Sequence, residues 1–242
     1  MNVYGSNIVY STTGAPVPIT GICENFSYKH AETLTEVIDI GEIAALIAHG
    51  KKGSLSFSST PLGTVAALGV RAGAELTISA ITGGKVIVTT SDAKWQRGQP
   101  MKMSAQANHY PDITAAGSGS TPPQAFSLSN GTGAVVLPTS KVWWGTSGIT
   151  GPVAGIVQSC SISESVQVQE EEDNAGKITA VITHSYKATG SIEVITDAAI
   201  PDVGGTLDIF GSFKITSAEE KWAKGQVRMI MVEGILVPGV TS

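Results

Sequence analysis

The feature that most constrains this chain is an internal repeat. Residues 94–99 read KWQRGQ, and residues 221–226 read KWAKGQ. Segments upstream of these two hexapeptides recur in the same order: residues 21–22 at 155–156, 43–49 at 178–184, 53–57 at 190–194, and 76–78 at 207–209. The order predicts two homologous units of about 100 residues within one chain.

The repeat sets the expected domain boundaries. We place the first unit at residues 1–113 and the second at residues 140–242, and each is long enough for its own core. Residues 114–139 between them are dense in Gly, Ser, Thr and Pro. Such a segment cannot bury enough apolar surface to fix its own fold, so we expect a linker or an extended arm that lies on a neighbour.

The composition predicts a mainly β fold. Charged residues make up only 14% of the 242, while Gly reaches 28 and β-branched residues are frequent. Apolar residues alternate with period two at the start of each unit, as at Ile22, Phe26 and Tyr28. We expect two tandem β-sandwich or barrel domains, each with at most one short helix.

Long strands are predicted at residues 85–95 and 213–222, with return strands at 101–107 and 227–237. Gly98 and Gly225 then supply the tight turns of two hairpins. Residues 42–48 alone favour a helix, but their partner, 177–183, is β-branched, so we predict strands for both. The best helix candidate is the segment 62–68.

The sequence offers little chemistry. Cys23 and Cys160 stand where the other unit has Val157 and Phe26, so we expect buried free thiols and no disulfide. The four histidines lack metal-ligand spacing, and the acidic run 170–173 reads as a solvated turn. We expect no metal, no cofactor and no enzymatic activity. A net charge of −5 argues against a surface that grips nucleic acid, and no leader or membrane-length apolar run is seen.

Tryptophans flanked by cations are the candidate contact residues. A structural role, with the cations solvated or paired with acids of an adjacent subunit, competes with stacking on a bound ligand. The adjacent tryptophans before Gly145 either form a contact site or cap the core. The proposed subunit contacts are Trp95, Trp222, Arg97, Lys224, Trp143 and Trp144.

Two fused β units suggest head-to-tail assembly, since an exposed strand edge can pair with a like unit and a closing contact makes a ring. The repeated unit, the progression from residues 205–209 to 215–217, the closing KWxKGQ hairpin and the long polar arm resemble the tail tube proteins of tailed bacteriophages.

The resemblance implies tail-tube-type β-sandwich subunits whose sheets join around a lumen, in rings that stack into a DNA conduit. Duplicated domains imply homotrimeric rings of pseudo-sixfold symmetry. The expected partners are further copies, other tail proteins (sheath, baseplate or tape measure) and genomic DNA that passes without specific binding, with no membrane. The expected location is the virion, after assembly in the host cytoplasm.

Other functions stay open. A baseplate hub, tube initiator or neck protein could use the same paired domains without polymerising. A non-catalytic decoration or carbohydrate-binding β-sandwich could use Trp143 and Trp144 as a sugar platform. An enzyme is the weakest alternative, because it would need a convergent pocket of titratable groups that the sequence does not reveal.

Overall fold

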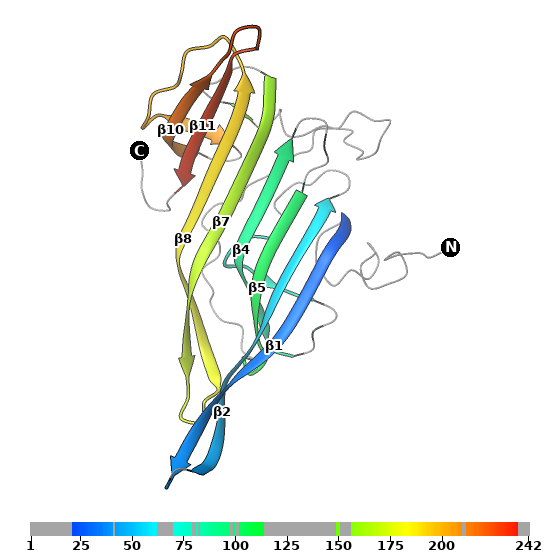
Figure 1. Ribbon diagram of the computed structural model, residues 1–242, viewed down its shortest axis with the longest axis vertical. Helices are drawn as coiled ribbons and strands as arrows, with labels where there is room; N and C mark the ends of the chain where they lie inside the picture. The colour runs from blue at the N-terminus through cyan, green and yellow to red at the C-terminus, as the bar shows by residue number, and fades with distance from the viewer. Residues whose placement is uncertain are drawn as a thin grey trace, which may run out of the picture.

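The computed structural model describes residues 21–40, 42–61, 70–78, 81, 83–96, 99, 102–113, 149–150, 156–209 and 212–236. Within these residues the chain is mainly β and holds no helix, which confirms the predicted mainly β fold (Figure 1). The strands are β1 (Gly21–Asp39), β2 (Glu42–Pro61), β3 (Glu75–Leu76), β4 (Lys85–Gln96), β5 (Lys102–Tyr110), β6 (Ile149–Thr150), β7 (Ile156–Glu172), β8 (Ile178–Ile195), β9 (Thr206–Ile209), β10 (Ser212–Lys221) and β11 (Met229–Leu236).

All of these strands belong to one 11-stranded antiparallel sheet. Its order is β1-β2-β5-β4-β7-β8-β11-β10-β9-β6, and β3 pairs with β4 beside this path. The first half of the chain thus contributes β1-β2-β5-β4, and the second half contributes β7-β8-β11-β10 in the same arrangement. Because β4 pairs with β7, the sheet runs unbroken across both halves. The described strands of both halves therefore share one sheet, and the division into two tandem β-sandwich or barrel domains stays a prediction.

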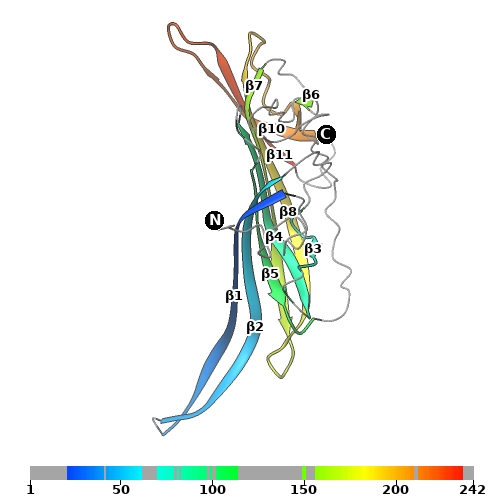
Figure 2. The same cartoon turned by 90° about the vertical axis from the view of Figure 1, so that its right-hand side faces the viewer.

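The strands form because apolar and polar residues alternate along them. In β5, Met103, Ala105 and Ala107 are buried, while the intervening side chains face solvent. The period of two places the apolar set on one face of the sheet. In Figure 2, β3 and β6 lie on one side of this curved sheet. Buried side chains from both halves, including Val88 and Phe213, belong to one hydrophobic cluster.

The two longest hairpins, β1–β2 and β7–β8, extend past the core. The end of β1–β2 projects beyond the rest of the sheet in both views (Figures 1 and 2). Its apolar side chains are exposed, at Leu34, Val37, Ile38, Ile40, Ile43, Leu46 and Ile47. A hairpin with so much exposed apolar surface is unusual for a chain that stays alone in water.

The sequence located most of the strands. Residues 42–48 lie in β2 and residues 178–183 lie in β8, so the β-branched segment was the better guide. Both closing hairpins, β4–β5 and β10–β11, are present, and Gly225 turns with φ +81°. The helix candidate 62–68, the linker 114–139 and the turn at Gly98 lie outside the described residues.

Candidate subunit-contact edges

The junction between the two halves is an ordinary antiparallel strand pair. Residues 90–96 of β4 pair with residues 159–165 of β7, from Thr90 opposite Ser165 to Gln96 opposite Ser159. Ala93 and Ile162 face each other in this ladder, and their exposed fractions are 0% and 1%. On this face of the sheet the junction is therefore buried like the core on either side of it.

A buried ion pair lies beside this junction. Glu164 of β7 is fully buried, and its carboxylate accepts from Arg71 Nε at 2.7 Å and from the Ala72 amide at 3.1 Å. The Tyr186 hydroxyl donates to the same carboxylate at 3.0 Å and accepts from Arg71 Nη2 at 2.9 Å. Burial raises the pKa of Glu164, while the Arg71 guanidinium and the other donors oppose that rise.

This ion pair crosses the two halves. Arg71 comes from the segment before β3 in the first half, and Glu164 and Tyr186 come from β7 and β8 in the second. A buried carboxylate needs both charge and hydrogen-bond partners, so the two halves must meet in one defined register.

The outer edges of the four-strand sets are β1 and β10. Among the described residues, β1 pairs only with β2. On β10, residues 212–214 pair with β9, and no strand of the described residues flanks the remainder on the side away from β11. The parts of a sheet edge that lack a neighbouring strand can offer backbone donors and acceptors to another strand.

Large apolar side chains gather near these edges. Tyr28 of β1 is 39% exposed, Trp222 after β10 is 72% exposed, and Val203 before β9 is 66% exposed. Tyr28 is oriented by its hydroxyl, which lies 2.9 Å from Nδ1 of the buried His109. His109 Nε2 lies 2.9 Å from the Gly83 carbonyl oxygen, so Nε2 donates and Nδ1 accepts from Tyr28.

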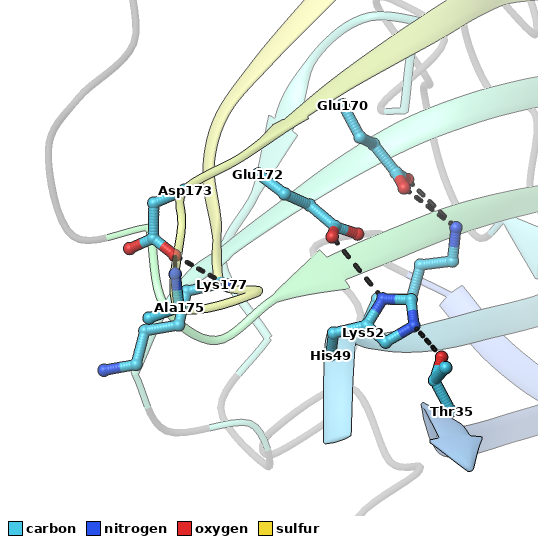
Figure 3. Close-up of polar contacts among 8 residues, drawn as sticks. All are labelled: Thr35, His49, Lys52, Glu170, Glu172, Asp173, Ala175 and Lys177. Carbon is cyan, nitrogen blue, oxygen red and sulfur yellow. Dashed lines mark hydrogen bonds and ion pairs between the residues drawn. The ribbon is translucent and has the colours of Figure 1, made fainter. Parts of the chain in front are cut away.

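The β7–β8 hairpin contacts the first half through charged side chains (Figure 3). Lys52 Nζ donates to Glu170 at 2.9 Å, and His49 Nδ1 lies 3.5 Å from Glu172. Asp173 accepts from the amides of Ala175 and Lys177, both at 2.9 Å, which closes the turn. The acidic run therefore serves the hairpin and its contact with β2, and it is more than a solvated turn.

The predicted contact residues have different outcomes. Trp222 and Lys224 are exposed at the β10–β11 turn, as a contact site requires. Trp95 lies in β4, opposite Cys160 of β7, within the junction itself. Arg97, Trp143 and Trp144 lie outside the described residues.

Sequence reasoning missed Arg71 and Glu164. Neither residue lies in the repeated segments of the sequence, so the repeat gave no signal for them. A lone acid in the otherwise apolar and small face of β7 was the only clue.

Reactive sites are scarce in the part of the chain that is described. Cys23 and Cys160 are both free thiols; Cys160 is buried, as predicted, but Cys23 is only partly buried. Burial raises the pKa of Cys160. No group of three His, Cys, Asp or Glu residues among the described residues could hold a metal ion. Two open hollows are lined mainly by short and hydroxyl-bearing side chains of β2 and β5, or of β8 and β11. No helix within the described ranges is long and apolar enough to cross a membrane.

Comparison with known proteins gives no family. No family model matches this sequence, and no curated protein is similar enough to be counted as a relative. The edges of the sheet are therefore the features of this chain that bear most directly on its function.

Proposed function

We propose that the two halves of the chain are copies of one β unit. Strand order supports this, and the irregularities of the strands support it further. Bulges are conserved features of a fold, so a shared pattern is more specific than shared strands. Each bulge of the first half has a counterpart in the second: Cys23/Asn25 and Val157/Ser159, Ala31/Thr33 and Ser165/Gln167, Val37/Ile38 and Glu171/Glu172, Val88/Thr90 and Ile215/Ser217.

Backbone conformation follows the same correspondence. Gly50 and Ser185 lie at matching bulges, and both have positive φ, +63° and +54°. Positive φ is uncommon for serine, so its recurrence at this position is informative. The strand registers also correct the sequence alignment by two residues, because Leu55, and not Gly53, occupies the place of Gly190.

The chain assembles head to tail with further copies and closes into a ring. The observation that carries this proposal is the junction of β4 with β7. There the last strand of the first unit's set, β4, pairs with the first strand of the second unit, β7. The equivalent outer edges of the chain, on β10 of the second unit and β1 of the first, have no such strand partner among the described residues. A heterologous contact of this kind generates a ring if the rotation closes.

Such a ring is the building block of a tube, so we assign the protein as a structural subunit of a phage tail tube. Trimeric rings would then hold six similar units and stack around a lumen. The acidic balance of the chain, −5, suits a channel through which DNA must slide without binding. The projecting β1–β2 hairpin supplies further apolar surface for neighbouring copies. Other tail proteins would meet the ends or the outside of this tube.

Electron microscopy of the purified chain, with sedimentation over a range of concentrations, tests this assignment. Stacked rings or filaments are the expected result. Single rings that never stack would instead favour a hub, initiator or neck protein. A chain that stays monomeric at high concentration would contradict ring assembly and leave a binding module as the better reading.

A further inference from the structure

We propose that β10 of one copy pairs with β1 of the next in the register of the internal β4–β7 junction, and that an ion pair between Lys187 and Glu36 fixes this contact. The proposal rests on the proposed ring assembly and adds its register and its charges. It follows from transferring each contact of the internal junction to the matching residues of the outer edges.

The matching bulges fix which residue of one half corresponds to which residue of the other. The bulge at Val88/Thr90 matches that at Ile215/Ser217, so residues 90–96 of β4 correspond to 217–223. The bulges of β1 and β7 likewise match residues 159–165 to 25–31. Ser91 opposite Glu164 then becomes Ala218 opposite His30, and Asp92 opposite Ser163 becomes Glu219 opposite Lys29.

The charges at the outer edges agree with this register. Glu219 and Lys29 carry opposite charges and would lie directly across from each other, which favours an antiparallel pair. Both side chains are exposed in the single chain. No like charges face one another anywhere in the seven positions of this ladder: Ser217–Ala31, Ala218–His30, Glu219–Lys29, Glu220–Tyr28, Lys221–Ser27, Trp222–Phe26 and Ala223–Asn25.

The ion pair at the base of the internal junction has a counterpart of the same signs. Lys52 and Glu170 join the two halves at 2.9 Å. Lys187 of β8 occupies the place of Lys52, and Glu36 of β1 occupies the place of Glu170. Lys187 and Glu36 are both exposed in the single chain. A lysine and a glutamate thus lie at the two outer edges, in the positions that correspond to the ion pair inside the chain.

The buried cluster of Arg71, Glu164 and Tyr186 has a counterpart at the outer contact, in which the acidic and basic positions are exchanged. Arg71 corresponds to Asp202, since matching hydrogen bonds precede β3 and β9: the Ala74 amide donates to the Arg71 carbonyl, and the Gly205 amide to that of Asp202. Glu164 and Tyr186 correspond to His30 and Lys51.

Asp202 of one copy would therefore meet His30 and Lys51 of the next. All three side chains are exposed in the single chain. The exchange of acidic and basic residues keeps the charges at the outer contact complementary. It also disfavours the wrong pairing of β4 in one copy with β1 of another, because Arg71 would then meet His30 and Lys51.

The same transfer accounts for the exposed apolar residues. Ala72, at the internal junction, is fully buried, and its counterpart Val203 is 66% exposed. Ile162 is 1% exposed, whereas its counterpart Tyr28 is 39% exposed. A second copy in this register would cover both side chains, so the occupant of the edge is another copy of this chain.

A charge-swap experiment on the full chain tests the ion pair. Lys187→Glu and Glu36→Lys are each expected to weaken assembly about tenfold or more in sedimentation, since like charges then meet. The double variant K187E/E36K restores the attraction and is expected to assemble within about threefold of the unmodified chain. Lys177→Glu makes the same charge change at an exposed site on the β7–β8 turn and should assemble normally.

The outcomes separate this register from ring assembly itself. If the unmodified chain forms rings but the single variants assemble normally, or the double variant fails to recover, the register is wrong and the ring stands. If the unmodified chain never assembles, the ring and the register both fail.

A cross-link provides a second readout that does not depend on charge. Strand neighbours across an antiparallel ladder have Cα atoms about 4.5–5.5 Å apart, which a disulfide can span. Ala218→Cys with His30→Cys should therefore cross-link between chains on oxidation. Glu219→Cys with His30→Cys places one thiol on the opposite face of the sheet and should not. Equal cross-linking of the two pairs would overturn the register.

Discussion

Replacement of Arg71 by methionine tests the strongest electrostatic contact between the two halves. The substitution keeps much of the apolar stem but removes the guanidinium that lies 2.7 Å from the Glu164 carboxylate. Glu164 has no exposed surface while Arg71 is in place, so its carboxylate depends on partners within the protein. Breaking a buried ion pair in this way costs about 3–5 kcal/mol of unfolding free energy at neutral pH.

The cost should depend on pH with a defined sign. Burial already raises the pKa of Glu164 above its value in the unfolded chain, and loss of the Arg71 charge raises it further. A carboxyl group with a raised folded pKa loses stability as pH rises from its unfolded pKa through its folded pKa. The destabilisation by Arg71→Met should therefore shrink as pH is lowered from 7 towards 5, because protonated Glu164 is neutral.

Urea denaturation of both chains at pH 7 and pH 5 measures these differences. Lys52→Met is the matched control: it breaks the partly exposed ion pair with Glu170 and should cost only about 0–1 kcal/mol. An equal, small cost for both variants, or a cost for Arg71→Met that grows at pH 5, would refute the account of the junction.

Three further predictions concern the fold. Gly225→Ala should lower the free energy of unfolding, measured by heat or urea, by about 1–2 kcal/mol, because φ is +81° and the space around the new Cβ is open. Gly84→Ala should lower it by more, because its Cβ would lie 2.3 Å from the Tyr110 carbonyl oxygen. Hydrogen bonds to the Glu24 carboxylate lower its pKa, so that stability is present above its unfolded pKa and is lost as pH falls; Glu24→Gln should flatten the unfolding free energy between pH 5 and pH 3. Cys160 should resist a thiol reagent until the chain unfolds, as mass spectrometry would show, because burial raises its pKa.

The sequence predicted the strands well because their information is local. Period-two alternation and β-branched residues mark a strand without knowledge of its partners. Comparison with the similar segment 177–183 also corrected the prediction for residues 42–48, where alanine and leucine favoured a helix but the similar segment did not. The similar segment thus gave a second, independent indication of a strand.

The shared sheet could not be predicted in this way. Whether two similar units stand apart or join depends on which sheet edges meet, and the sequence repeat did not show which edges pair. The pairing of Arg71 with Glu164 was hidden for a similar reason. These residues lie 93 positions apart. Under the proposed duplication their counterparts are Asp202 and His30, so neither the motif nor the charge recurs.

A reconstruction by electron cryomicroscopy of the assembled chain tests the central claim most directly. It should show an uninterrupted antiparallel ladder from β10 of one copy to β1 of the next, with Ala218 opposite His30, so that each ring has one closed sheet. Rings held together through other surfaces, with no strand added to the outer edges of β1 and β10, would contradict the account.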